Sequence, residues 1–329
     1  MTYSGIVMDG DHVRDHVEQA QAAERLGFGS AFVTEVQEPD AITVLTAAAA
    51  GTERIRIGTG IVPIGLRDPY LAAMSFWSLQ DLSGGRTIAG FGVSTPAIVT
   101  TWHGLPWDRP LARMREYIEL FRGMTGGERL RHEGLYQTRA PALPAAAPSI
   151  PVYIGALGER MLELAGEIAD GVILNYPTVT TIARSVAAIE RGIARSGRAR
   201  ADVRILAFLR TVIDDSYEAA SAPIKDELLA YFMAPVYQRV FTADGYGDDC
   251  EAFVARWGAR EREQAIAGIS EAFVRAHAVV GRSADECRAQ AEGLVAAGLD
   301  EALLYPIAAA GVPNEQAAVL ETIRALAPV

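Results

Sequence analysis

Short apolar runs alternate with amphipathic segments of helical length along most of this chain. Eight runs have the length of buried strands, at residues 4–8, 30–34, 55–62, 87–92, 152–155, 172–175, 203–210 and 301–306. Between the first two, Val13, Val17, Ala20 and Leu26 recur at helical spacing and stop at Gly27, as expected of an amphipathic helix. Because eight alternating strands and helices close into a barrel, the pattern predicts an α/β fold, a (β/α)8 TIM barrel.

Two segments do not fit this repeat. Residues 140–151 are rich in alanine and proline, which predicts an extended crossing at the surface. Residues 214–281 are too long for one crossover, and their helical pattern holds a cluster of aromatic residues. We interpret this segment as a helical cap, inserted before the last repeat and covering the site. The whole chain, residues 1–329, is expected to form one domain.

The composition predicts a cytoplasmic protein and limits which partners it can bind. No apolar run reaches the ~18 residues that a membrane span needs, and the N-terminus lacks the pattern of a signal peptide. Cys250 and Cys287 have no metal-ligand spacing, so we expect neither a metal site nor a disulfide. The formal net charge of −11 argues against nucleic acid or an anionic membrane as partner, because both bind basic surfaces.

Glycine-rich strand ends are the first candidate functional features. Gly58-Thr59-Gly60-Ile61 ends the third predicted strand, and Gly90-Phe91-Gly92-Val93-Ser94-Thr95 ends the fourth. Glycine lets a flat ligand approach the backbone closely, and barrel enzymes carry their sites at the carboxyl ends of the strands. We therefore expect Gly60, Gly92, Gly155 and Asn175 to converge at one mouth of the barrel.

A further glycine run follows the fifth predicted strand. Gly155-Ala156-Leu157-Gly158-Glu159-Arg160 opens a helix. The free N–H groups and positive dipole end of a helix attract phosphate, and Arg160 can add a positive charge. This run predicts a phosphate-binding loop.

The order and spacing of these motifs resemble the bacterial luciferase-like family. Besides the glycine runs, the resemblance rests on Arg67-Asp68-Pro69, Ser83-Gly84-Gly85-Arg86, Trp102-His103-Gly104, Pro110-Leu111-Ala112-Arg113 and Arg115-Glu116-Tyr117. The chain is most similar to the branch that uses the deazaflavin coenzyme F420. The resemblance implies that coenzyme F420 binds at the mouth, with FMN as the alternative, and that the ring rests against a non-prolyl cis peptide at Gly60-Ile61.

The resemblance also implies which residues bind the coenzyme and how the chain assembles. The binding residues are Thr59, Gly60, Ile61, Gly92, Ser94, Thr95, Gly155, Ala156, Leu157, Gly158, Glu159, Arg160 and Asn175. Barrels of this family commonly pair, so a homodimer is expected. Helix faces around Met74, Phe76 and Trp77 suit either a dimer surface or the core.

The candidate catalytic residues depart from the pattern of the relatives. An acid and a histidine follow the second strand in related enzymes, where this chain has Glu35 and Val36, and some relatives carry a glutamate where Thr95 stands. Glu35 is therefore the candidate acid, with a salt-bridged carboxylate as the equal alternative. His103, in a family motif, is the second catalytic candidate, and its alternative role is to orient a loop.

The leading hypothesis is an oxidoreductase that transfers a hydride between coenzyme F420 and a small organic substrate. Two alternatives stay open. One is an FMN-dependent monooxygenase of the same family. The other is a non-catalytic flavin- or deazaflavin-binding paralogue, which the missing histidine favours. Fold analogy alone does not separate these hypotheses.

Overall fold

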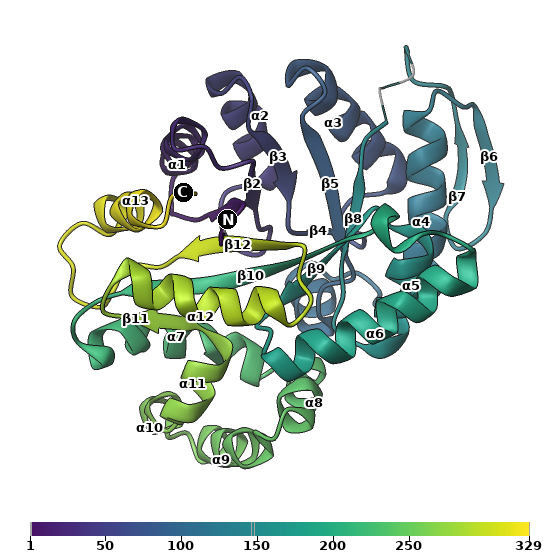
Figure 1. Ribbon diagram of the computed structural model, residues 1–329. Helices are drawn as coiled ribbons and strands as arrows, with labels where there is room; N and C mark the ends of the chain where they lie inside the picture. Colours follow the sequence, from purple (N-terminus) through teal and green to yellow (C-terminus); the bar gives the residue numbers. More distant parts are fainter. Residues whose placement is uncertain (1, 146, 148, 329) are drawn as a thin grey trace.

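A closed barrel of eight parallel strands forms the centre of the molecule (Figure 1). The computed structural model describes residues 2–145, 147 and 149–328. Strand β12 pairs with β1 and β10, and β10 pairs with β9, which closes the ring. In order around the ring, the strands are β1 (Gly5–Met8), β2 (Ser30–Val33), β3 (Arg56–Thr59), β5 (Thr87–Gly92), β8 (Val152–Gly155), β9 (Gly171–Asn175), β10 (Arg204–Ile213) and β12 (Glu301–Pro306). The predicted TIM barrel is confirmed.

Helices surround the barrel, and polar capping residues set where several of them begin. Asp68, which precedes Pro69, accepts hydrogen bonds from the N–H groups of Tyr70 and Leu71. Such caps satisfy amide groups that the first turn of a helix leaves free. The outer helices are α1 (Val13–Arg25), α2 (Ala41–Gly51), α3 (Pro69–Leu82), α4 (Pro110–Thr125), α5 (Glu159–Ile168), α6 (Val179–Ser196), α12 (Ala284–Ala296) and α13 (Glu315–Ala325).

Large side chains fill the barrel, so its axis is not a channel. Phe32 stacks on Tyr153 with ring centroids 6.3 Å apart. The interior cluster consists of Val7, Phe32, Ile88, Tyr153, Ile173, Leu206, Phe208, Leu303 and Tyr305. Because the interior is packed, a ligand must bind at an end of the barrel, as in other barrels of this kind.

The third predicted strand is interrupted. The apolar pattern predicts one strand over residues 55–62, but β3 ends at Thr59 and the short strand β4 (Val62–Pro63) pairs separately with β5. The Gly60–Ile61 peptide bond between them is cis, as the resemblance implied. After β5, the segment Ala97–Trp102 forms a π-helix, η1, which the sequence pattern does not indicate.

Smaller elements complete the barrel periphery. Strands β6 (Leu130–Glu133) and β7 (Gln137–Ala140) form an antiparallel hairpin, β11 (Val279–Gly281) pairs with the end of β10, and η2 (Arg200–Asp202) is a single 3-10 turn. The predicted crossing over residues 140–151 lies partly outside the described residues. Those of residues 141–151 that are described contain neither helix nor strand.

Five helices connect β10 to β11, in the segment predicted as a helical cap. They are α7 (Tyr217–Phe232), α8 (Pro235–Ala243), α9 (Gly247–Gly258), α10 (Arg262–Ala267) and α11 (Glu271–His277). In Figure 1, α8 to α11 lie together at the lower end of the view. Phe232 packs on Phe253 and on Phe273 with ring centroids 4.9 Å apart in each pair, so the segment has an apolar core of its own. That barrel and cap form one domain stays a prediction.

One buried carboxylate fastens this cap to the barrel helix α6. The side chain of Asp244, just after α8, is 1% exposed and pairs with Arg184. Asp244 also accepts hydrogen bonds from the hydroxyl groups of Thr178, at 2.9 Å, and Thr181. Thr178 caps the N-terminus of α6, where a negative charge is favourable because of the helix dipole.

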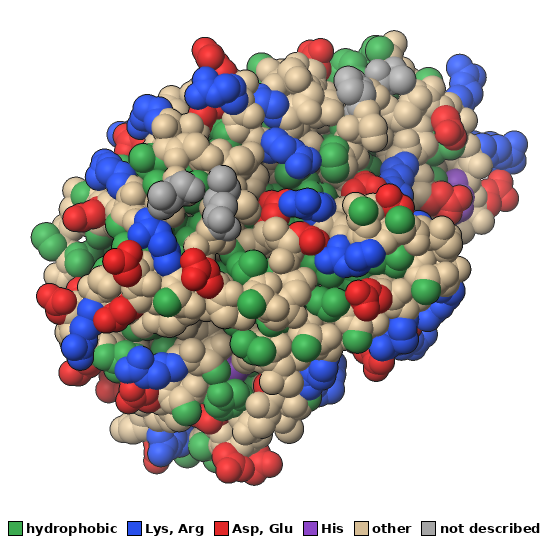
Figure 2. All heavy atoms as spheres, viewed as in Figure 1, with side chains coloured by type: hydrophobic (Ala, Val, Ile, Leu, Met, Phe, Trp, Pro, Cys, Tyr) green, Lys and Arg blue, Asp and Glu red, His purple; other side chains and the backbone are tan. Residues whose placement is uncertain are grey.

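The surface carries charges of both signs. Figure 2 shows basic and acidic side chains interspersed over the visible face. Between α5 and α6, Arg195 pairs with Glu163 at 2.9 Å and with Glu167 at 2.7 Å. Within the described part of the chain, every helix is too short or too polar to cross a membrane.

Replacing Thr59 with valine is expected to lower the free energy of unfolding by about 2–6 kcal/mol. The fully buried Thr59 hydroxyl donates to the carbonyl of Gly90 at 2.7 Å and accepts from its N–H at 2.9 Å. Valine keeps the shape but leaves two buried backbone groups without a partner, at about 1–3 kcal/mol each. Chemical denaturation measures the loss, with Thr46→Val on the exposed face of α2 as control. Equal stability of the two variants would contradict this expectation.

Candidate active site

Three glycines leave the backbone bare along one side of the barrel mouth. Gly60, Gly92 and Gly155 stand at the carboxyl ends of the neighbouring strands β3, β5 and β8. A Cβ atom on Gly155 would lie 2.9 Å from the Ile61 side chain, one on Gly92 would lie 2.5 Å from it, and one on Gly60 would strike the ring of Phe208. Only glycine fits these positions, so the backbone of three adjacent strand ends packs closely against Ile61 and Phe208. We call them the glycine arc.

The start of α5 adjoins the glycine arc and has free amide groups. Gly158 is the N-cap of α5 and has no heavy atom within 4 Å of a Cβ built on it. The N–H groups of Gly158, Glu159 and Arg160 donate no hydrogen bond to any described residue. The Glu159 carboxylate is turned away onto Arg191 at 2.5 Å, whereas Arg160 is exposed. This arrangement fits an anionic group of a ligand.

The opposite side of the mouth carries polar side chains instead. Asn175, at the end of β9, donates from Nδ2 to the hydroxyl of Tyr237 at 2.7 Å and accepts from Arg210 through Oδ1. Along β10, Leu206 and Phe208 belong to the barrel interior. Because strand side chains alternate, Arg210 continues this inward-facing row. We call Asn175, Arg210, Tyr305 and Asp9 the polar arc.

Arg210 is the most deeply buried charge described in the polar arc. Its side chain is 2% exposed, and its guanidinium lies 3.9 Å from the ring centre of Tyr176 and 4.6 Å from that of Tyr305. Nε and Nη2 both donate to Glu227 Oε1 on α7, at 2.8 and 2.6 Å. Although burial opposes it, the charge of Glu227 holds the pKa of Arg210 above its usual value. This ion pair thereby joins helix α7 of the cap to strand β10 of the barrel.

Asp9 follows β1 and completes the polar arc. Its Oδ1 accepts a hydrogen bond from the N–H of Gly10 at 2.9 Å. Burial raises the pKa of Asp9, and the negative charges of Glu38 and Glu227 raise it further. A carboxyl group with a raised pKa at the end of a barrel strand is a candidate general acid.

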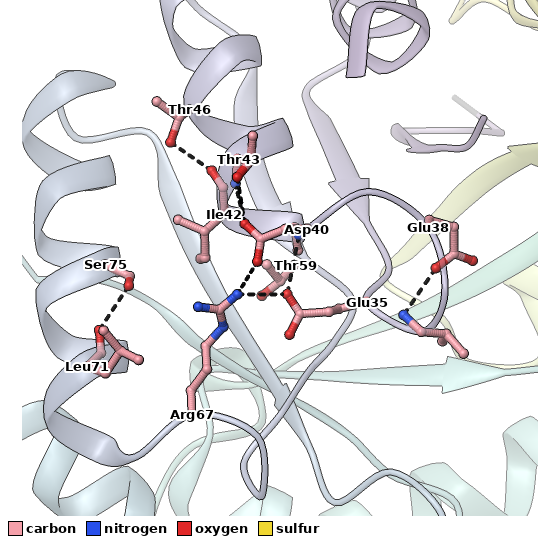
Figure 3. Close-up of polar contacts among 12 residues, drawn as sticks. Glu35, Glu38, Asp40, Ile42, Thr43, Thr46, Thr59, Arg67, Leu71 and Ser75 are labelled. Carbon is pink, nitrogen blue, oxygen red and sulfur yellow. Dashed lines mark hydrogen bonds and ion pairs between the residues drawn. The ribbon is translucent and has the colours of Figure 1, made fainter. Parts of the chain in front are cut away.

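Glu35, predicted as an acid, lies in an ion-pair network (Figure 3). Its Oε2 accepts from the N–H of Ala41 at 3.2 Å and from Arg67 Nη2 at 3.1 Å. Arg67 also binds Asp40, which caps α2. Figure 3 shows Arg67 reaching between these two carboxylates. The geometry matches the salt-bridged alternative, and a catalytic role for Glu35 stays a prediction.

His103 stands on an exposed loop that follows the π-helix η1. No described residue forms a hydrogen bond or ion pair with it, and its neighbour Trp102 is 54% exposed. Trp107 anchors the loop by donating from Nε1 to the carbonyl of Val93 at 3.0 Å. His103 is therefore not a member of Glu35's network, and its catalytic role stays a prediction.

The remaining predicted coenzyme contacts differ in how available they are. Ser94 has a φ of 57°, uncommon for a residue other than glycine, and Thr95 accepts from the N–H of Ile98 at 3.4 Å. The Thr59 hydroxyl is bound to Gly90. Ala156 is buried, and Leu157 packs partly against the cap. These residues can contribute backbone groups to the mouth more readily than side chains.

Sequence reasoning missed Asp9, Arg210 and Glu227. A signal for Arg210 was present, because a charge at the end of the apolar row Leu206, Phe208 must be paired when buried. Nothing in the sequence pattern pointed to Glu227 as its partner, since the partner lies on another element.

The profile of the luciferase-like monooxygenase family matches residues 2–301 of this chain. This chain belongs to the luciferase-like monooxygenase family. A Mycobacterium tuberculosis protein, named as a coenzyme F420-dependent oxidoreductase whose activity is unproven, is 32% identical over 313 residues, 87% of this chain and 89% of that protein. The 5,10-methylenetetrahydromethanopterin reductase of Methanolobus tindarius is 29% identical over 325 residues, 97% of each chain. The family resemblance seen in the motifs is confirmed.

A solved structure agrees with this placement in the luciferase-like family. The coenzyme F420-dependent tetrahydromethanopterin reductase from Methanopyrus kandleri superposes with a TM-score of 0.79 over 98% of this chain and 97% of that one. The two are 24% identical in sequence. The likeness therefore concerns the fold.

Replacing Asp40 with asparagine is expected to destabilise the protein at neutral pH, with a smaller effect as the pH falls through the lowered pKa of this carboxyl group. Although burial opposes it, hydrogen bonds from Thr43 and the charge of Arg67 lower the pKa of Asp40. A lowered carboxyl pKa stabilises the fold above the unfolded value of about 3.9, and this stabilisation is lost as pH falls through the folded value. Thermal unfolding at several pH values, with the exposed Asp215→Asn as control, measures it. A destabilisation that does not change with pH would contradict the expectation.

Proposed function

We propose that this chain is an oxidoreductase that transfers a hydride between coenzyme F420 and a small organic substrate. The division of the mouth into a glycine arc and a polar arc carries the proposal. A flat ring can lie against the bare backbone of the first arc, while the side chains of the second can bind substrate and handle a proton. The names of the Mycobacterium and Methanopyrus proteins support coenzyme F420 as the cofactor.

The residues of the glycine arc and of the α5 start fit the coenzyme. Gly60, Ile61, Gly92 and Gly155 would face the ring, and the amides of residues 158–160 would hold the phosphate. Ser94, Thr95, Ala156 and Leu157 would line the same side. When bound, the coenzyme supplies or accepts the hydride. The chain orients it and excludes water.

Asp9 is the best-placed proton donor for this reaction. It is partly buried at the end of β1, and burial raises the pKa of its carboxyl group, which suits a proton donor. Glu35 is already bound by Arg67, and His103 is exposed. The absence of a histidine at Val36 therefore does not remove the acid from the site.

Coenzyme F420 is expected to bind more tightly than FMN. Fluorescence titration of the purified protein with each coenzyme measures both dissociation constants. Tighter binding of FMN would favour a monooxygenase instead. Binding of reduced coenzyme F420 without turnover of any carbonyl, imine or activated alkene would favour the non-catalytic paralogue.

Replacing Gly158 with leucine is expected to weaken coenzyme binding at least tenfold while the fold survives. The new side chain enters open space at the α5 start, so it obstructs an incoming phosphate without straining the protein. Gly258→Leu, at a similarly open position of α9, is the matched control. Unchanged affinity of the Gly158 variant would exclude phosphate binding at the start of α5.

We also propose that the chain forms a cytoplasmic homodimer through α3. Phe76 belongs to the core and Trp77 donates to the carbonyl of Ala145, but Leu71, Met74 and Leu82 are 44%, 45% and 49% exposed on one face of the helix. A row of exposed apolar side chains favours burial against a second copy.

Met74→Glu is expected to turn a dimer into a monomer, because it places a charge in the proposed apolar interface. Light scattering coupled to size exclusion measures the mass. Val254→Glu is the control, because Val254 on α9 is an apolar residue with a similar exposed fraction, 46%. A wild-type protein that is monomeric at tens of micromolar would refute the proposal.

A further inference from the structure

We propose that the Arg210–Glu227 ion pair is a second functional element of the mouth, in which the cap supplies a fixed anion that acts on the acid Asp9. Glu227 is then a positioning residue, and Arg210 holds it in place. The inference rests on the proposed function for the use of the proton. The arrangement of Arg210, Glu227 and Asp9 does not depend on a bound coenzyme.

The ion pair fixes one end of the Glu227 carboxylate and leaves the other end open. Both bonds from Arg210 go to Oε1, at 2.8 and 2.6 Å, and no described residue donates a hydrogen bond to Oε2. The Glu227 side chain is 27% exposed, against 2% for Arg210.

Strand pairing brings this pair close to Asp9. Arg210 on β10 stands opposite Tyr305 on β12, and β12 pairs on its other side with β1, which Asp9 follows. Burial raises the pKa of Tyr305, and the charges of Asp9 and Glu227 both add to that rise. The charges of both carboxylates thus act on the same tyrosine.

A buried hydroxyl without a partner marks the place for another polar group. Tyr176 is fully buried, has a φ of 51°, and packs its ring on Arg210. Its hydroxyl lies beside Glu227, but no described residue meets it at hydrogen-bond geometry. Since a buried unpaired hydroxyl costs about 1–3 kcal/mol, a polar group of a bound ligand beside Tyr176 would be favourable.

Several charged groups face Asp9 from the elements packed around it. Glu38 approaches from the loop before α2 and Glu227 from the cap, and both raise its pKa, while His16 on α1 opposes them. A neighbouring carboxylate that stays ionised favours the protonated form of the other. Glu227 is paired with Arg210, and its negative charge adds to the rise in the pKa of Asp9.

The proton has a defined use in the proposed reaction. When a hydride adds to the carbon of a C=O or C=N bond, the π electron pair moves to the heteroatom. The heteroatom takes the proton from Asp9, which becomes a carboxylate and is reprotonated by solvent. The opposite direction returns the proton to Asp9.

Infrared spectroscopy of the coenzyme-free protein tests the proposal directly. The carbonyl band of the protonated Asp9 carboxyl, identified by its loss in Asp9→Asn, is followed against pH. Glu227→Gln keeps an oxygen acceptor for Arg210 but removes the charge. In the Glu227→Gln variant, the midpoint of the Asp9 titration is expected to fall by about 0.5–1 pH unit. The pH above which turnover declines should fall with it.

The neighbouring Asp226→Asn is the matched control, because Asp226 is exposed on the same helix and should leave the midpoint unchanged. An unchanged midpoint in a folded Glu227→Gln protein overturns the proposal. If that variant does not fold, Glu227→Asp decides. It retracts the charge by one methylene and should shift the midpoint in the same direction by less, so an unchanged midpoint again overturns the proposal. Failure to bind coenzyme would count against the proposed function but leave this titration valid.

Discussion

A buried guanidinium is the constraint on which the mouth of this barrel depends. Taking a charge out of water costs several kcal/mol unless it is paired and hydrogen-bonded. Arg210 meets that need with Glu227 from α7, Asn175 from β9 and the rings of Tyr176 and Tyr305. Because these partners come from different elements, satisfying one charge fixes the cap relative to the strand ends. Loss of a single partner would leave an uncompensated ion in the floor of the site.

The glycine arc and the polar arc divide the work between backbone and side chains. The first presents strand ends on which no Cβ atom fits beside Ile61 or Phe208, so its shape depends on the backbone. The second depends on particular side chains joined in one network. Val36, where relatives carry histidine, is 44% exposed on the loop after β2 and belongs to neither arc. Its change therefore leaves both arcs intact, which favours a working enzyme over a non-catalytic paralogue.

The elements of this fold follow from local pattern, while the site depends on pairings that no local pattern contains. Apolar runs and glycine stops were enough to predict the barrel strands, and the motifs to predict the family. The break between Thr59 and Val62 was missed because the apolar run is continuous there. The directions of the Thr59 hydroxyl and the Glu159 carboxylate were missed because their partners, Gly90 and Arg191, lie about thirty residues away. Long-range pairing also explains why Glu227 gave no signal.

The same network explains how an acidic chain can hold an anionic coenzyme. Arg67 is bound by Glu35 and Asp40, and Arg210 by Glu227, so neither offers a free positive charge. Arg160 differs, because it makes no ion pair with any described residue and stands at the positive end of α5. In physiological salt, charges farther than about 8–10 Å are largely screened. The overall charge of −11 therefore matters less to a phosphate at α5 than the helix amides and Arg160 beside it. Anion recognition can be local in a protein whose surface is acidic as a whole, and the neutralised arginines of the mouth leave the polar arc to the substrate.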